Sequence, residues 1–209
     1  MPLAILGEMD NMTSAAEHAI VSTVILTNPH HLRRTKPVNY QDRLERFQNA
    51  VQGEADLVFL PISADLQYLT GIPRDIPNFG AVLHPGGWLE GLWLAPSKTP
   101  VLALTRMSAE FGALAGAGSV ERRILGDFDD PAALVRDILA GFNLPATPRV
   151  AISDHTKGET IVGLQGVLSG AVYVSATELL NPQRAVKSAE EIEAMRRAGA
   201  VTEAAFSDV

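Results

Sequence analysis

The residue types best suited to chemistry gather at Ser153-Asp154-His155, at the end of the apolar run 149–153. Ligands often bind at strand ends in open α/β sheets, and a carboxylate beside an imidazole can hold a metal or move a proton. The same residues also form turns and cap helices, and a single histidine without further ligands seldom makes a site. The sequence therefore favours a turn before a helix near residue 157 over a catalytic site.

Two further clusters have structural interpretations. The segment Asp127-Phe128-Asp129-Asp130-Pro131 offers carboxylates that would suit a hard cation, but Asp130 is also well placed to cap a helix that begins at Pro131. His30 and His31 are adjacent, so in a regular element their side chains diverge, unlike the i, i+4 pair of a helical zinc site. We interpret the acids as a helix cap and the histidines as a solvated pair in a linker.

Familiar catalytic motifs are missing from the sequence. HExxH, GxSxG and GxxxxGK[ST] do not occur, and the glycine-rich segment 112–120 lacks the third glycine of a dinucleotide-binding loop. That segment also follows a helical stretch instead of a strand, which favours a helix end. The absence of cysteine excludes disulfides, thiolate metal sites and cysteine nucleophiles, and it suits a reducing compartment.

Charge and length limit the classes of partner. The 209 residues carry a formal net charge of −7, which argues against a nucleic acid or an anionic membrane as the main partner. The apolar run 19–26 is too short to span a bilayer and is preceded by acidic residues, so we expect neither a signal peptide nor a membrane anchor. A cytoplasmic protein is the expectation.

Strands and helices must position any site, and hydrophobic periodicity predicts where they lie. Leu44, Phe47 and Val51 share one face of a predicted helix at 40–51, and a buried strand follows at 56–61. Four more strands are predicted between turn signals, at 67–72, 79–85, 91–96 and 100–105. Their close spacing favours antiparallel hairpins, because parallel neighbours need longer crossovers.

Strands and helices then alternate along the chain. Helices are predicted at 108–117, 131–142 and about 157–169, and strands at 122–125, 149–153 and 171–176. This order predicts an α/β fold with a mixed β-sheet and helices on both faces. We expect residues 177–188 to be a linker.

A further helix is predicted near the end of the chain. Ser188 and Glu191 have the spacing of a capping box, in which each side chain satisfies a backbone N–H at the helix start. Apolar or small residues then recur at steps of three and four, and this stripe needs another surface to bury it. They are Ile192, Met195, Gly199, Thr202 and Phe206.

Two stretches in a particular order carry a family resemblance. The first is Tyr68-Leu69-Thr70-Gly71, within ADLQYLTGI, and the second is NPQRAVKSAEEIEAMRRAG, which begins at Asn181. YQDRLERFQNAV and ADLVFLP precede the first stretch, and NFGAVLHPGG lies between the two. In this order, the stretches resemble the N-terminal part of the creatinase, prolidase and Xaa-Pro aminopeptidase family. The resemblance covers about residues 38–205, and residues 1–36 match nothing in it.

The resemblance implies a division of the chain and a place for the chemistry. It implies an extension or linker at 1–36, a creatinase/prolidase N-terminal-like domain at 37–180, and a linker with the first helix of a truncated catalytic domain at 181–209. In the family, that catalytic domain binds two divalent metals, commonly manganese, cobalt or zinc, through aspartate, histidine and glutamate. No catalytic residue or metal ligand is therefore expected in this chain, which resembles a fragment of a metallopeptidase that cleaves X-Pro bonds.

In the family that this chain resembles, the N-terminal domain makes subunit contacts and covers the active-site cleft. The resemblance implies a homodimer, short proline-containing peptides as substrates of the parent protein, and Gln67, Tyr68 and Arg74 as residues that cap the substrate. Arg74 could bind a substrate carboxylate bidentately; a core tyrosine and a solvated loop arginine are the structural alternative. Other members of the family hydrolyse the C–N bond of creatine or have lost catalysis and serve as interaction modules, and both alternatives stay open.

Overall fold

The computed structural model describes residues 38–74, 85–112 and 120–207. The chain divides into two compact units, one from Asn39 to Val186 and a second that contains residues 187–207. We describe each unit by itself. No helix in the described ranges combines the length and the apolar character that crossing a membrane requires.

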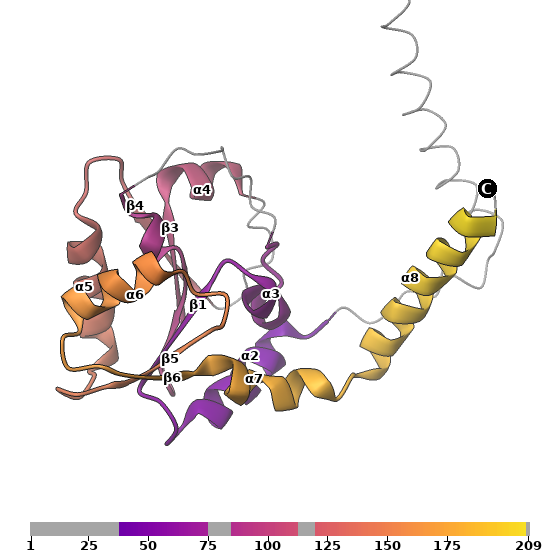
Figure 1. Ribbon diagram of the computed structural model, residues 1–209, viewed down its shortest axis with the longest axis horizontal. Helices are drawn as coiled ribbons and strands as arrows, with labels where there is room; N and C mark the ends of the chain where they lie inside the picture. The colour runs from indigo at the N-terminus through magenta and orange to yellow at the C-terminus, as the bar shows by residue number, and fades with distance from the viewer. Residues whose placement is uncertain (1–37, 75–84, 113–119, 208–209) are drawn as a thin grey trace, which may run out of the picture. The chain divides into compact units, whose positions relative to one another are not determined.

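A mixed sheet of six strands lies at the centre of the Asn39–Val186 unit (Figure 1). Its strand order is β4-β3-β2-β1-β5-β6. β1 and β2 pair antiparallel, as do β2 and β3, whereas β1–β5, β5–β6 and β3–β4 are parallel. The strands are β1 (Leu57–Pro61), β2 (Gly91–Leu94), β3 (Val101–Thr105), β4 (Glu121–Leu125), β5 (Arg149–Ile152) and β6 (Val172–Ser175). The predicted antiparallel pairing in the first part of the sheet is confirmed.

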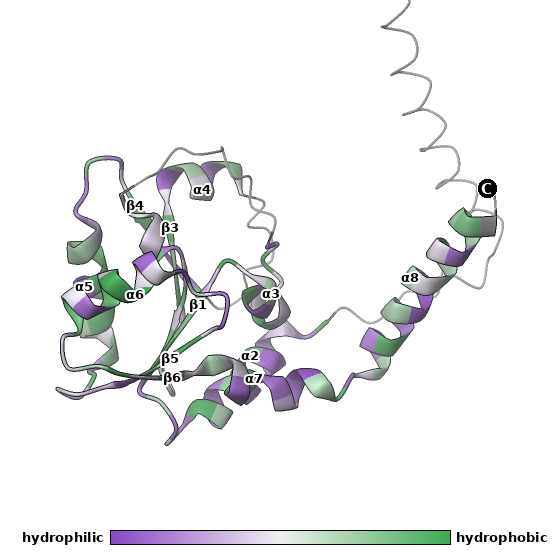
Figure 2. Ribbon diagram, in the orientation of Figure 1, coloured by the Kyte–Doolittle hydropathy of each residue, from purple (hydrophilic) through white to green (hydrophobic). Residues whose placement is uncertain are grey.

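Helices cover both faces of this sheet, because strand side chains point alternately to opposite sides. Val58 and Leu60 of β1 pack with α2 (Tyr40–Val51), α3 (Ala64–Thr70) and α7 (Ala176–Ala185). Leu57 and Phe59 point the other way and pack with α5 (Pro131–Phe142) and α6 (Gly158–Val167). Figure 2 shows hydrophobic residues on α5 and α6 and along the strands. The predicted α/β fold is confirmed.

The acidic segment before α5 forms the predicted helix cap. The Asp130 carboxylate accepts a hydrogen bond of 2.9 Å from the Ala132 N–H, and Pro131 begins the helix. Asp129 accepts from the Gly126 N–H, and Asp127 forms an ion pair with Arg106 on α4 (Arg106–Phe111). The two carboxylates of Asp127 and Glu110 raise the pKa of Arg106. These local bonds give each of the three aspartates a structural role that needs no metal ion.

The predicted strand at 67–72 is wrong, because α3 occupies this segment. The Ser63 hydroxyl caps the helix by accepting from the Leu66 N–H, and Gly71 ends it in the left-handed conformation at φ 76°. The Thr70 hydroxyl donates a hydrogen bond to the Leu66 carbonyl within the helix. Seven residues are too few for a clear helical period, so the β-branched and aromatic residues suggest a strand. The predicted strand at 79–85 lies almost wholly outside the described residues.

The predicted linker at 177–188 is also wrong over most of its length. α7 begins after Ser175, whose hydroxyl accepts from the Glu178 N–H, and it buries Ala176 and Leu180 against the sheet. Pro182 lies inside this helix, where a proline cannot donate the backbone hydrogen bond. The helix continues because α7 packs on α2, β1 and β5. Most of the glycine-rich segment 112–120, as well as His30 and His31, lies outside the described residues.

The remaining described helices are the short 3₁₀ turn η2 (Gly87–Leu89) and α8 (Ala189–Ser207), which belongs to the second unit. The capping box of α8 is confirmed. The Ser188 N–H donates to Glu191 Oε2 at 2.7 Å, and the Glu191 N–H donates to Ser188 Oγ at 3.2 Å. Ile192, Met195 and Phe206 of the predicted stripe are exposed.

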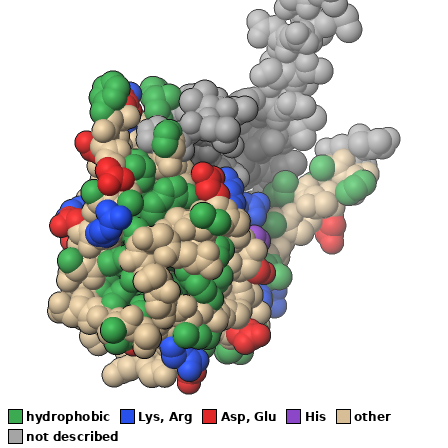
Figure 3. Space-filling view, turned by 60° about the vertical axis from the view of Figure 1, so that its left-hand side comes forward, with side chains coloured by type: hydrophobic (Ala, Val, Ile, Leu, Met, Phe, Trp, Pro, Cys, Tyr) green, Lys and Arg blue, Asp and Glu red, His purple; other side chains and the backbone are tan. Residues whose placement is uncertain are grey.

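Hydrophobic side chains are also visible on the surface of the larger unit. Figure 3 views the side that carries α5 and α6, where hydrophobic side chains lie among acidic and basic ones. Val162 of α6 and Phe128 of the loop before α5 are among the exposed residues. Scattered exposure of this kind is common in soluble domains, so it does not by itself indicate a partner.

Candidate functional site

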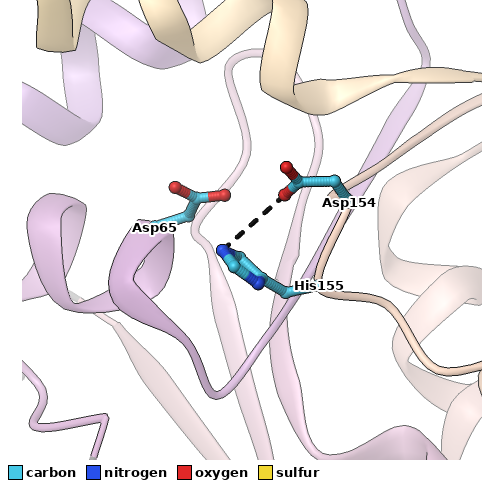
Figure 4. Close-up of side chains that lie close together, drawn as sticks. All are labelled: Asp65, Asp154 and His155. Carbon is cyan, nitrogen blue, oxygen red and sulfur yellow. Dashed lines mark ion pairs between the residues drawn. The ribbon is translucent and has the colours of Figure 1, made fainter.

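Asp65, Asp154 and His155 come together at the carboxyl end of β5 (Figure 4). Asp65 lies in the first turn of α3, which follows β1, and the other two follow β5. Because β1 and β5 are parallel neighbours, their carboxyl ends lie at the same edge of the sheet. One ligand atom from each side chain lies within 4.8 Å of those of the other two. This is the kind of strand-end position at which α/β sheets bind ligands.

Asp65 is the buried member of this group, with only 1% of its surface exposed. Its Oδ1 forms an ion pair with Arg184 of α7, and its Oδ2 accepts a hydrogen bond of 2.9 Å from Ser153 Oγ. Burying a carboxylate is costly unless a cation and hydrogen bonds compensate the charge. Arg184 and Ser153 provide that compensation.

Asp154 and His155 are exposed, and their side chains make few contacts. His155 Nε2 lies 3.7 Å from Asp154 Oδ1, and the backbone N–H of each residue is bound by a hydroxyl, that of Thr177 for Asp154 and that of Ser153 for His155. These bonds make the segment a turn between β5 and α6, as the sequence predicts. The helix cap itself is Lys157, whose side chain makes no capping bond.

The three side chains suit a divalent cation in number and type, but the surroundings of Asp65 do not. Both oxygens of Asp65 already have partners, and a metal ion there would face the Arg184 guanidinium. Within the described ranges this is the one group of three or more possible ligands, and it does not match a dinuclear site of two aspartates, a histidine and two glutamates. The geometry supports a structural ion pair better than a metal centre.

A network of polar contacts continues from this ion pair to α2. We define the α2–α3–α7 network as Arg43, Asp65, Tyr68, Gln183 and Arg184. The Tyr68 hydroxyl donates to the Gln183 carbonyl at 3.2 Å, and the Arg43 guanidinium donates to the Tyr68 carbonyl at 3.0 Å. The Gln183 amide donates to the Arg43 carbonyl at 2.9 Å, and the Arg43 guanidinium lies 4.2 Å from the centre of the Tyr68 ring. Three helices are therefore tied together by buried and half-buried polar groups.

The network joins the two stretches of sequence that carry the family resemblance. The Tyr68–Gln183 bond connects residues 115 positions apart, and the Asp65–Arg184 ion pair connects residues 119 positions apart. Tyr68 belongs to the YLTG stretch, and Gln183 and Arg184 belong to the stretch that begins at Asn181. The two stretches thus have a shared structural role in this unit, since each supplies the partner of the other.

The predicted capping residues lie on and after α3, not in a loop after a strand. Gln67 is exposed on the helix, and Arg74 is exposed just beyond its end. Tyr68 is half-buried, and its hydroxyl is bound within the domain. The structure brings none of the three into contact with Asp154 or His155 through a described bond, and their capping role stays a prediction.

Sequence reasoning missed the buried residues Asp65 and Ser153 as partners. Asp65 lies in a mostly apolar stretch, and an acid in such a place is a signal for a buried ion pair. The sequence gives no indication of which base would pair with it, because Arg184 is far away in the chain.

Replacing Tyr68 with phenylalanine tests the network directly. The variant keeps the ring beside Arg43 but leaves the Gln183 carbonyl without this donor, so we expect the free energy of unfolding to fall by about 1 kcal/mol. Denaturant unfolding followed by tryptophan fluorescence measures it, since Trp88 and Trp93 both lie in this unit. A variant as stable as the native chain would show that the hydroxyl bond is not needed.

Comparison with solved structures relates the fold to known proteins. A dipeptidase from Mycobacterium ulcerans is 29% identical over 81% of this chain and 43% of its own, with a TM-score of 0.62. A dipeptidase from Pyrococcus horikoshii is 20% identical over 79% of this chain and 43% of its own, with a TM-score of 0.64. The creatinase/prolidase N-terminal domain of an X-Pro dipeptidase from Streptococcus pyogenes is 18% identical over 68% of this chain and 98% of its own, with a TM-score of 0.52.

These structures show that the chain has the fold of a creatinase/prolidase N-terminal domain. The chain matches less than half the length of the two dipeptidases. No protein-family model matches the sequence, and a search of curated proteins finds no match.

Proposed function

We propose that this chain is the non-catalytic N-terminal part of a protein that hydrolyses X-Pro peptide bonds, an Xaa-Pro dipeptidase or aminopeptidase. The observation that supports the proposal is the likeness to an isolated N-terminal domain of an X-Pro dipeptidase, of which this chain covers 98%. The order of the two sequence stretches that meet in the α2–α3–α7 network adds to it.

The proposed chemistry belongs to residues outside this chain. An X-Pro bond is a tertiary amide, and two divalent cations such as manganese, cobalt or zinc would polarise its carbonyl and lower the pKa of a bound water. The group formed by Asp65, Asp154 and His155 does not fit such a centre. The role proposed for the Asn39–Val186 unit is therefore to shape access to a catalytic domain and to contact a second subunit in a cytoplasmic homodimer.

Gln67 on α3 and Arg74 just after it are the proposed contacts with substrate. Gln67 and Arg74 are exposed, and a guanidinium can bind the carboxylate of a short peptide with two parallel hydrogen bonds. Tyr68 is the weaker candidate, because its hydroxyl is already bound to Gln183. A short peptide carries its carboxylate close to the scissile bond, so such a contact would select short substrates.

An activity assay tests this proposal. The 209-residue chain, incubated with manganese and a Gly-Pro dipeptide, should give no turnover, whereas the chain extended into a catalytic domain should hydrolyse the dipeptide. Steady turnover by the pure 209-residue chain would contradict a non-catalytic role. Activity of the extended protein on creatine but not on Gly-Pro would favour a creatinase-type hydrolase, and activity on neither would favour an interaction module.

A further inference from the structure

A pocket lies where β1 and β5 begin, at the opposite end of these strands from Asp65. It has a volume of about 280 Å³. That is just below the range of pockets that hold drug-sized molecules, so it suits a smaller ligand. Its walls come from the end of α2, the starts of β1 and β5, the end of β2 and the end of α5.

Two opposite charges line this pocket on neighbouring strands. Asp56 precedes β1 and Arg149 begins β5, beside the paired residues Leu57 and Val150. The Asp56 N–H donates to the Arg149 carbonyl, and the Arg149 N–H donates to Asp56 Oδ2, each at 2.8 Å. The position of the carboxylate is thus set by the backbone of the neighbouring strand.

Each of these charged groups keeps unused bonding capacity. Among the described residues, no side chain or carbonyl accepts from the Arg149 guanidinium, and the only bond to the Asp56 carboxylate comes from the Arg149 backbone. The two side chains do not form an ion pair with each other within the same ranges. A pocket with one carboxylate and one guanidinium has no net charge, so it suits a ligand that carries both charges itself.

Apolar residues form one side of the pocket. Phe142 and Ala95 are buried, Leu144 is half-buried, and Pro96 and Pro145 complete this side. Such a surface suits a short hydrocarbon body next to the two charges. Gln52 and Asn143 add polar groups to the pocket.

We propose that this pocket binds a small zwitterion of the α-amino-acid class, with its carboxylate on Arg149, its ammonium group on Asp56 and its apolar body against Phe142 and Leu144. The site goes beyond the proposed peptidase role and does not depend on it, because it is built from residues of this chain alone. It lies away from Gln67 and Arg74, at the other end of the parallel strands.

Titration of the ¹⁵N-labelled 209-residue chain with L-proline tests the site, because proline combines both charges with a compact ring. We expect saturable shifts of the Gly53, Asn143, Leu144 and Arg149 amides. Pyrrolidine lacks the carboxylate and cyclopentanecarboxylate lacks the ammonium group. Each should therefore bind at least about tenfold more weakly than proline. The absence of saturable shifts with proline, or equal binding of the three compounds, would overturn the proposal.

Matched arginine variants separate the site from general effects. Arg149→Met should weaken proline binding about tenfold, and Arg149→Lys should keep part of the affinity because it keeps the charge. Arg136→Met is the control, since Arg136 is an exposed residue of α5 outside the pocket. Equal weakening by Arg149→Met and Arg136→Met, with both variants unfolding like the native chain, would overturn the proposal. A loss of peptidase activity in the extended protein would not bear on it.

Discussion

Replacing Arg184 with methionine is expected to lower the free energy of unfolding of the Asn39–Val186 unit by about 3 kcal/mol. The change leaves the Asp65 carboxylate buried, with 2% of its side chain exposed, and without the cation that now compensates its charge. Removing one partner of a buried ion pair costs about 3–5 kcal/mol, and the lower value applies because the Arg184 side chain is 37% exposed. Denaturant unfolding of the full chain, followed by tryptophan fluorescence, measures the change.

An exposed arginine and a double variant serve as controls. Arg106 forms ion pairs with Asp127 and Glu110 at the surface, where solvent screens the charges, so Arg106→Met should destabilise the unit far less than Arg184→Met does. Adding Asp65→Asn to Arg184→Met removes the uncompensated charge and should restore part of the lost stability. If Arg184→Met were no more destabilising than Arg106→Met, the ion pair would not hold α7 against α3.

Gly91→Ala is the second substitution with a large expected effect, again about 3 kcal/mol of lost stability. Gly91 lies in β2 with φ at 156°, and a Cβ atom there would lie 2.3 Å from the Leu60 carbonyl oxygen of β1. Alanine would have to adopt a strained backbone and push two paired strands apart at Pro61–Gly91. Backbone strain and overpacking each cost about 1–3 kcal/mol.

Gly141→Ala is a matched control for that substitution. A Cβ atom at Gly141 meets nothing within 4 Å, and the residue lies inside α5. Alanine is the better helix former, so this variant should be about 0.5–1 kcal/mol more stable than the native chain. Equal unfolding midpoints for Gly91→Ala and Gly141→Ala would contradict the close approach of β1 and β2 at Gly91.

The sequence predicts the long amphipathic helices and the buried strands well, because each has its own periodicity. The predicted helices at 40–51 and 131–142 match α2 and α5 at both ends, and Asp130 caps the latter. The order of strands and helices was enough to predict a mixed sheet covered on both faces. These features depend on local patterns of apolar residues.

Two segments show where local patterns fail. α3 is too short for a helical period, and its ends depend on the Ser63 hydroxyl and on Gly71. α7 contains Pro182, which read alone suggests the end of a helix, but its packing against α2 and the sheet stabilises it. In both cases tertiary contacts outweigh the local preference of the residues.

The candidate site was predictable only in part. Ser153-Asp154-His155 stands out because polar residues follow an apolar strand, and its interpretation as a turn agrees with the bonds of Ser153. Asp65 and Arg184 could not be paired from the sequence, since the fold alone brings α3 and α7 together. Likewise, Asp56 and Arg149 meet only through the pairing of β1 with β5.

Because the chain is synthesised from its N-terminus, the two partners of the Asp65–Arg184 ion pair are made at different times. Asp65 is made 119 residues before Arg184, which at about 5–20 residues per second corresponds to roughly 6–24 s on the ribosome. During this interval α3 and β1 lack both β5 and the arginine that compensates the buried carboxylate. Contacts between distant residues also slow folding after release. The unit therefore cannot complete its core until its last helix has emerged, and its first half must stay soluble until then.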